Sequence, residues 1–269
     1  MERNTKISIN NISLRFGGTI ALNGVNLEIR NNELLALIGP NGSGKTSLLN
    51  SMTGFYHPQD GQILANGKDV VGLKPHKVAR MGISRSFQKV ELFTQLSVVD
   101  NLMVARHTKI RQGPFASAIF FGPARAQEVY NRQIVEEVID FMELEQVRKE
   151  IVGSIPYGLR KRIGVARALV MEPEVLLLDE PMAGMNVEEK EDLVRFVLDI
   201  YKGARFGYDS KFLNNGVRCI VLIEHDMGII MDIAERIAVL DFGVKIAEGP
   251  PKEISKNPDV IKAYLGEEV

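Results

Sequence analysis

The chain is 269 residues long, and with 45% hydrophobic and 25% charged residues it has the composition of a globular protein that buries a core. A net charge of −1 provides no general basic field for nucleic acid, and a single cysteine excludes a disulfide framework within the chain. Residues 1–11 are too polar for a signal peptide and no apolar run approaches the ~20 residues that span a bilayer, so we expect a cytoplasmic protein that reaches the inner face of the cell membrane only through a partner.

Residues 1 to about 70 are expected to form an antiparallel β region. Apolar residues alternate there with polar ones in two runs, as in strands with one buried face. The alternating residues are Ile7, Ile9, Ile12, Leu14 and Phe16 in the first run and Val25, Leu27 and Ile29 in the second. Gly17-Gly18 and Asn31-Asn32 are turn signals, and Asn66-Gly67 predicts a hairpin.

This β region opens into a phosphate-binding loop, because one segment fits the pattern G-x-x-x-x-G-K-[ST]. Its residues are Gly39, Pro40, Asn41, Gly42, Ser43, Gly44, Lys45 and Thr46. A buried strand is expected before it, over Leu34–Ile38, and a helix after it, over Ser47–Thr53. Glycines let the backbone wrap phosphate groups, and the helix start directs N–H groups at them. Lys45 would bring its charge to the β- and γ-phosphates of a nucleotide, and the Thr46 hydroxyl could coordinate Mg²⁺.

Residues from about 90 to 160 are expected to be helical. Apolar residues recur there at helical spacing, with acidic residues between them: Ile134, Val135, Val138, Phe141 and Met142. The segment Gln112–Pro123, rich in Gly, Pro and aromatic residues, should interrupt the helices. Because this region divides an α/β core, we expect a helical subdomain within one domain that spans residues 1–269.

Residues from about 165 to 250 are expected to alternate between helix and strand. Three short apolar runs have the character of buried parallel strands, namely Val175–Leu178, Cys219–Ile223 and Arg236–Leu240. Cys219 is therefore expected to be a buried structural thiol.

Two carboxylates, Asp179 and Glu180, end the first of these runs. Beside a phosphate loop, Asp179 could hold the Mg²⁺ shell and Glu180 could orient or deprotonate an attacking water. An Asp-Glu pair alone more often marks a solvated strand end. The phosphate loop earlier in the chain favours the functional interpretation.

Three further segments stand in a fixed order around these motifs: Ser86-Phe87-Gln88, Ile155–Arg162 and Ile223–Met227. With them the chain resembles, along essentially its whole length, the ATPase subunits of ABC transporters. The segments Gly39–Gly42, Arg85–Gln88, Ile223–Met227 and Asn257–Gly266 are similar to the LivG-type branch, which serves importers of branched-chain amino acids. The last segment is shared in part with the ATPase of lipopolysaccharide export.

The resemblance implies ATP and Mg²⁺ as cofactors and assigns roles to single residues. It implies that Phe16 stacks on adenine, a core phenylalanine being the alternative. It implies that Gln88 senses Mg²⁺ and the γ-phosphate and that His225 contacts the γ-phosphate, so both join Glu180 in catalysis. Thr46, Gln88 and Asp179 would hold the metal.

The fold implied is a phosphate-loop NTPase of the α/β class, with an antiparallel β subdomain and a helical subdomain. Two such subunits would close head-to-tail on two ATP molecules. Met182–Asn186, together with the signature residues Tyr157 and Gly158, would reach the ATP that the partner subunit holds.

The signature segment departs from the family pattern Leu-Ser-Gly-Gly-Gln. Pro156 stands in the place of the serine and Leu159 in that of the glutamine, which removes two polar side chains. We therefore expect a heterodimer with a second, LivF-like ATPase that supplies an intact signature, a homodimer being the alternative. Arg160–Arg162 are expected to form a solvated basic face, and Gly203–Val217 an inserted exposed loop.

The implied function is an ATPase that powers uptake of branched-chain or related amino acids. The implied partners are transmembrane permease subunits and, indirectly, a periplasmic or extracellular substrate-binding protein, with no nucleic acid. Two alternatives stay open: the ATPase of another ABC system, for lipid or lipopolysaccharide export or for urea or aromatic-acid uptake, and a soluble ABC ATPase that acts on ribosomes or DNA.

Overall fold

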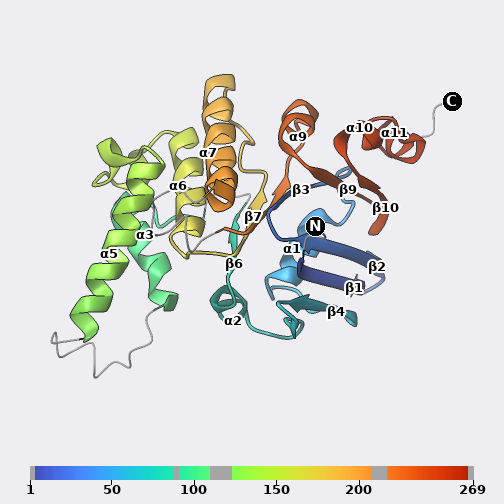
Figure 1. Cartoon of the computed structure of the whole chain (residues 1–269), viewed down its shortest axis with the longest axis horizontal. Coiled ribbons are helices and arrows are strands. Elements are labelled where there is room, and N and C mark those ends of the chain that lie inside the picture. The colour runs from blue at the N-terminus through green and yellow to red at the C-terminus, as the bar shows by residue number, and fades with distance from the viewer. Residues whose placement is uncertain (1–3, 88–90, 110–122, 207–216, 266–269) are drawn as a thin grey trace.

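The computed structural model describes residues 4–87, 91–109, 123–206 and 217–265. It contains a four-stranded and a six-stranded sheet. In Figure 1 helices α3 and α5 lie at one end of the molecule, beyond α6 and α7, and the smaller sheet lies toward the other end. This arrangement confirms an α/β fold with a separate antiparallel sheet and a helical region.

The smaller sheet is antiparallel and has the strand order β2-β1-β4-β5. Its strands are β1 (Thr5–Phe16), β2 (Thr19–Arg30), β4 (Asp60–Ala65) and β5 (Lys68–Asp69). The turn predicted at Gly17-Gly18 and the hairpin predicted at Asn66-Gly67 are both confirmed, because Phe16 pairs with Thr19 across the first and Ala65 pairs with Lys68 across the second. Asn66 and Gly67 both have positive φ, as a type I′ turn requires.

A β-bulge in β1 explains a break in its alternating pattern. Ile9 and Ile12 are three positions apart, so a regular strand would point them to opposite faces. The pairing register with β2 shifts between them, and Asn11 adopts a left-handed φ of 52°. The extra residue returns Ile12 to the core face, and both isoleucines are buried.

The larger sheet has the order β10-β9-β3-β8-β7-β6. Its strands are β3 (Glu33–Ile38), β6 (Ile83–Ser86), β7 (Val175–Asp179), β8 (Cys219–Ile223), β9 (Arg236–Asp241) and β10 (Val244–Gly249). All neighbours are parallel except β10, which pairs antiparallel with β9. The predicted parallel strands and the buried Cys219 are thus confirmed.

Helices connect these strands. The α-helices are α1 (Lys45–Met52), α2 (Pro75–Arg80), α3 (Val98–Arg106), α5 (Pro123–Phe141), α6 (Tyr157–Leu169), α7 (Val187–Phe206), α9 (Met227–Ile233), α10 (Pro251–Ile254) and α11 (Pro258–Leu265). Short 3₁₀ turns are η1 (His107–Lys109), η2 (Glu145–Val147) and η3 (Val152–Ser154). None of the helices in the described ranges is long and apolar enough to cross a membrane.

The two faces of the larger sheet belong to two hydrophobic cores. Leu34, Ala36 and Ile38 of β3 pack into the core that also contains the helical region. Leu35 and Leu37 point to the opposite face and share a core with the smaller sheet and α1. A strand buried on both faces reads as a continuous apolar run, which is why β3 could be predicted.

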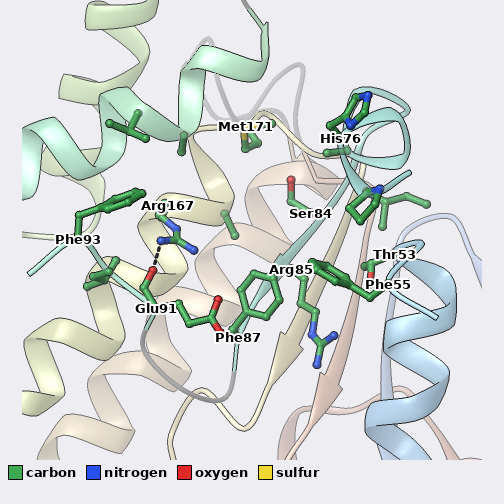
Figure 2. Close-up of a pocket in the computed structure, with 17 residues that line it drawn as sticks. Thr53, Phe55, His76, Ser84, Arg85, Phe87, Glu91, Phe93, Arg167 and Met171 are labelled. Carbon is green, nitrogen blue, oxygen red and sulfur yellow. Dashed lines mark hydrogen bonds between the residues drawn. The ribbon is translucent and has the colours of Figure 1, made fainter. Parts of the chain in front are cut away.

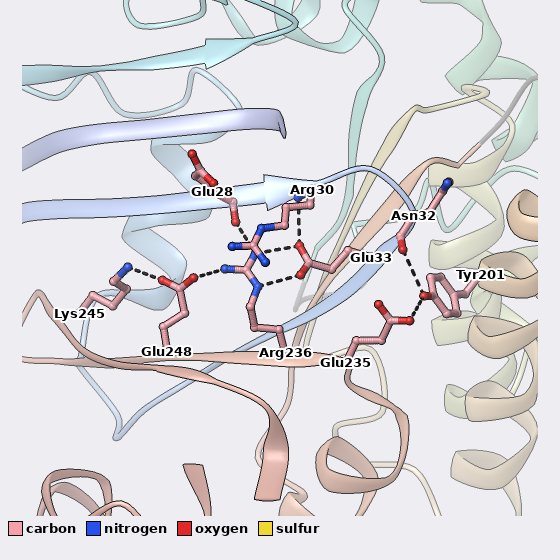
Figure 3. Close-up of polar contacts among 9 residues, drawn as sticks. All are labelled: Glu28, Arg30, Asn32, Glu33, Tyr201, Glu235, Arg236, Lys245 and Glu248. Carbon is pink, nitrogen blue, oxygen red and sulfur yellow. Dashed lines mark hydrogen bonds and ion pairs between the residues drawn. The ribbon is translucent and has the colours of Figure 1, made fainter. Parts of the chain in front are cut away.

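A buried ionic cluster ties β2, β3, β9 and β10 together (Figure 3). Arg236 of β9 donates from Nε to Glu33 Oε1 at 2.7 Å and from Nη2 to Glu33 Oε2 at 2.8 Å, and it also pairs with Glu248. Glu248 is paired in turn with Lys245. Burial alone would lower the pKa of Arg236, but the hydrogen bonds and charges of Glu33 and Glu248 raise it above the usual value.

The prediction of an exposed loop over Gly203–Val217 is wrong at both ends. Helix α7 continues to Phe206, and Gly203 is buried within it. Val217 is also buried, at 3% exposure, where the chain enters β8. Residues 207–216 lie outside the described part of the chain.

Candidate functional site

The phosphate loop connects the end of β3 to the start of α1, and its backbone packs closely against neighbouring strands. Gly39 and Gly44 have φ values of 148° and 103°, which favour glycine. A side chain at Gly39 would overlap the carbonyl oxygen of Leu240, and one at Gly44 would lie 2.7 Å from that of Ala21. The loop backbone is therefore held against β9 and β2, with the first turn of α1 beside it.

Lys45 is buried and points back into this loop. Its Nζ donates to the carbonyl oxygens of Gly39 at 2.7 Å and Pro40 at 2.9 Å. Burial lowers the pKa of Lys45, while the charges of Glu180 and Asp179 oppose that shift. The lysine, the loop and the two carboxylates predicted from the sequence thus lie close together.

Asp179 ends β7 in full burial, with 0% exposure. Its Oδ2 accepts a hydrogen bond from Arg85 Nη2 at 2.5 Å. Its Oδ1 is buried and has no hydrogen-bond partner among the described residues. A free carboxylate oxygen near a phosphate loop that carries the Thr46 hydroxyl fits Mg²⁺, which prefers oxygen ligands and keeps few protein contacts.

Glu180 follows in a left-handed conformation, with φ of 47°. Its N–H donates to Ile223 O at 2.9 Å, and its own carbonyl accepts from Lys161 Nζ at 2.9 Å. These bonds fix the backbone just after β7, beside the end of the neighbouring strand β8. The carboxylate Oε1 then lies 2.9 Å from Nε2 of His225, so the structure joins two residues that are 45 positions apart.

Glu224 contributes a contact that the sequence patterns did not indicate. Its buried carboxylate accepts from the backbone N–H of Met182 at 2.7 Å and from that of His225 at 3.4 Å. Burial raises the pKa of Glu224, although both N–H groups oppose the shift. Glu224 thereby links the segment after Glu180 to the loop that carries His225.

Phe16 is placed at the tip of β1 with 47% of its surface exposed, so it is not a core residue. Its ring meets that of Tyr56 edge-on, with centroids 4.9 Å apart. The adjoining strand β2 touches the phosphate loop through Ala21 and Gly44. An exposed aromatic face beside the loop is compatible with stacking on a base.

The signature segment forms the start of α6. Tyr157 is 44% exposed and lies against Gly184, where an added side chain would come within 3.0 Å of its ring. Gly158 is buried against the carboxylate of Glu189, which leaves no room for a side chain. Pro156 occupies the N-cap position without a side-chain cap.

The expected solvated basic face after the signature is wrong for two of its three residues. Lys161 is only 3% exposed and binds the Glu180 carbonyl. Arg162 is 9% exposed, lies over the ring of Phe196 and pairs with Asp192 at 3.2 Å. Helical periodicity turns these residues inward, and each buried charge has a polar partner there.

An apolar groove with a volume of about 670 Å³ lies between α2, β6 and the helical region. Figure 2 shows the rings of Phe55 and Phe87 near each other, with Phe93 on the opposite side of the groove. The rings of Phe55 and Phe87 meet edge-on at 5.8 Å. Gln88, predicted to act in catalysis and metal binding, lies outside the described residues.

Comparisons with known proteins show the family to which the chain is similar. The family model "ABC transporter" matches residues 22–183, and a model for a "Branched-chain amino acid ATP-binding cassette transporter" matches residues 244–269. The chain is 37% identical to the "High-affinity branched-chain amino acid transport ATP-binding protein BraF" of Pseudomonas aeruginosa, over 97% of this chain and 98% of the relative. It is 39% identical to the protein called LivG of Escherichia coli, with the same coverage.

Solved structures support the fold in the same way. A nucleotide-free ATP-binding cassette from an ABC transporter superposes with a TM-score of 0.80 at 26% identity, covering 98% of this chain and all of the other. The ADP conformation of an ATP-binding cassette gives a TM-score of 0.79, also at 26% identity, over 98% of this chain and 99% of the other.

Proposed function

Because the chain belongs to the ATP-binding subunits of the ABC transporter family, we propose that it uses Mg²⁺ and ATP to power the uptake of branched-chain or related amino acids. The observation that carries this substrate class is similarity along almost the whole chain to two branched-chain amino acid transport ATP-binding proteins. The separate match at residues 244–269 supports the same branch. We also propose that residues 1–269 form one ATPase domain in which residues from about 90 to 160 are the helical subdomain.

In the proposed site the phosphate loop binds the triphosphate. Backbone N–H groups of residues 41–46 and the Lys45 ammonium would meet the phosphates once Lys45 leaves the carbonyl groups that it now contacts. Phe16 would stack on adenine with the face that Tyr56 leaves free.

We assign the metal to Thr46, Asp179 and Gln88. The free Oδ1 of Asp179 supports this assignment. When bound, Mg²⁺ would neutralise charge that develops on the phosphate oxygens. Asp179 and Thr46 would hold it at the loop without contributing a proton.

Glu180 is the proposed general base. Its carboxylate would accept a proton from the attacking water, and His225 at 2.9 Å would orient that carboxylate and contact the γ-phosphate. Lys161, which binds the Glu180 carbonyl, fixes the backbone that aims it.

Tyr157, Gly158 and Met182–Asn186 would meet ATP held by a second ATPase subunit. Two features support an unequal pair. Pro156 offers no donor at the N-cap of α6, and Leu159 offers no polar side chain. We therefore propose a heterodimer with a LivF-like subunit that supplies an intact signature.

The permease subunits would dock in the groove of Figure 2, whose lining is largely apolar. Docking there would place the chain at the inner face of the cell membrane. The permease subunits would then couple the chain to a substrate-binding protein on the other side of the membrane. The chain itself would never touch the transported amino acid.

The proposal is tested by purifying this chain with its membrane partners and screening ligands on the associated binding protein. We expect saturable binding of leucine, isoleucine or valine. A partner set that binds none of these and binds a lipid or sulfate would contradict the substrate class while leaving the ATPase assignment intact.

A further inference from the structure

Arg85 contacts three parts of the molecule: the proposed metal ligand Asp179, the helix α1 that follows the phosphate loop, and the apolar groove. Its side chain is 5% exposed at the end of β6. Nη2 donates to Asp179 Oδ2 and Nη1 donates to Asn50 Oδ1 of α1, both at 2.5 Å. The guanidinium carbon lies 5.2 Å from the ring centroid of Phe87, which lines the groove.

We propose that Arg85 is a positioning residue: it is the counter-ion of Asp179 until a divalent cation binds, and it weakens and regulates that binding. The inference rests on the proposed function, in which Asp179 belongs to the metal site. It adds a residue to which neither the motif pattern nor the assigned mechanism gives a role.

The burial of Asp179 makes a counter-ion necessary. A carboxylate removed from water is costly unless it is paired, and Arg85 supplies that charge through Oδ2. Oδ1 remains without a partner and stays available to a cation. Any cation at Oδ1 is then within a few ångströms of the guanidinium, and like charges repel strongly in a buried site. Arg85 should therefore lower the affinity for metal below the value that Asp179 alone would give.

The contact with Phe87 makes this effect depend on the groove. The Phe87 ring faces the guanidinium of Arg85 and meets Phe55 edge-on, and both rings line the groove (Figure 2). A segment that enters the groove and displaces Phe87 would remove one contact that holds Arg85 beside Asp179. Groove occupancy and metal affinity would then be linked, and the linkage must act in both directions.

The test measures Mn²⁺ affinity of the full chain in the presence of ADP, from the electron paramagnetic resonance signal of free Mn²⁺. Arg85→Gln should bind Mn²⁺ about tenfold more tightly, because it removes a neighbouring positive charge. Asn50→Ala and Phe87→Leu each remove one contact of the guanidinium and should shift the affinity in the same direction by roughly two- to threefold. A merely structural role would leave the affinity unchanged or weaken it.

Two variants control for general destabilisation. Arg106→Gln breaks another buried arginine–carboxylate pair, with Glu172 at 2.5 Å, and should leave Mn²⁺ affinity unchanged. Phe93→Leu alters another ring of the groove lining, one for which no contact with Arg85 is seen among the described residues, and it should also leave Mn²⁺ affinity unchanged. If Arg85→Gln does not fold, the Asn50 and Phe87 variants decide the question.

A second measurement separates this inference from the proposed function. Binding of a fluorescent ADP analogue in excess EDTA should be equal in the native chain and in Arg85→Gln. No nucleotide binding by the native chain would overturn the proposed function and the inference with it. Normal nucleotide binding with unchanged or weaker Mn²⁺ binding in all three variants would overturn only the role of Arg85.

Discussion

Glu180 combines an unfavourable backbone conformation with a polar environment that maintains it. A left-handed φ in a residue other than glycine costs on the order of 1–3 kcal/mol. The hydrogen bonds from Glu180 N–H to Ile223 O and from Lys161 Nζ to Glu180 O offset this cost. The result is a carboxylate held against His225, at the position proposed for the general base.

Replacement of Glu180 by glutamine should therefore remove hydrolysis and spare binding. The loss of a general base lowers the rate roughly 10²- to 10⁴-fold, while the amide keeps the shape and the contact with His225. Single-turnover hydrolysis and ATP titration measure the two effects. Glu188→Gln, in the exposed first turn of α7, is the matched control and should change neither. Unchanged turnover in Glu180→Gln would exclude Glu180 as the base.

Phe16→Ala should weaken the binding of adenine and guanine nucleotides alike. Loss of stacking on one base costs about 1–2 kcal/mol, which titration calorimetry resolves. Phe93→Ala removes an equally exposed ring from the groove and should leave nucleotide affinity unchanged. Equal affinities in the native chain and Phe16→Ala would show that the ring serves only to pack against Tyr56.

At the scale of elements, the start of α6 determines how well the signature works. Pro156→Ser restores a hydroxyl that can both cap the helix and donate to a phosphate. A hydrogen bond to a charged group contributes about 1.5–3 kcal/mol, so hydrolysis at the site completed by this signature should rise at least tenfold. Pro156→Asp caps the helix equally but carries a negative charge and cannot donate, so it should not accelerate hydrolysis. Equal rates in the two variants would assign the gain to capping.

Sequence patterns predicted those elements whose signals are local. The parallel strands, the β1–β2 hairpin and the phosphate loop follow from apolar runs, glycine turns and one motif. The burial of Lys161 and the pairing of Arg85 with Asp179 could not be predicted from the sequence patterns. Each depends on contacts between segments far apart in the chain, and a charged residue in sequence gives no sign of the partner that will bury it.

The ionic cluster of Figure 3 makes a prediction about stability. Arg236→Ala leaves the buried Glu33 carboxylate without a cationic partner, so the free energy of unfolding should fall by about 3–5 kcal/mol in denaturant titration. Arg195→Ala breaks the exposed pair with Glu143 and should cost less than about 1 kcal/mol. Equal losses would contradict the assigned importance of the buried cluster.

The same cluster should make stability depend on pH. Burial alone would raise the pKa of Glu248, but Lys245 and Arg236 together lower it below the ordinary value of a glutamate. The stability that ionised Glu248 contributes is therefore fully present above pH 4.5, and it is lost as the pH falls through the lower pKa that Glu248 has in the folded state. Glu248→Gln should flatten the acid limb of a plot of unfolding free energy against pH, and an unchanged limb would contradict it.

At the scale of the whole molecule, the weakened signature predicts unequal ATP sites. The site that contains Lys45, Asp179 and Glu180 should be active when a LivF-like partner supplies an intact signature, whereas this chain alone should turn over slowly. ATP hydrolysis measured before and after mixing with the candidate partner tests this directly. Rapid hydrolysis by the isolated chain, unaffected by the partner, would contradict an asymmetric dimer.

We propose that ATP hydrolysis at this site drives amino-acid uptake. The most direct measurement is transport of radiolabelled leucine into proteoliposomes that contain the permease subunits, both ATPase subunits and the loaded binding protein, with ATP supplied on the side of the ATPases. We expect uptake that requires ATP and Mg²⁺ and is abolished by Glu180→Gln in this chain. Leucine uptake that persists in Glu180→Gln, or ATP hydrolysis that moves none of leucine, isoleucine and valine, would contradict this function.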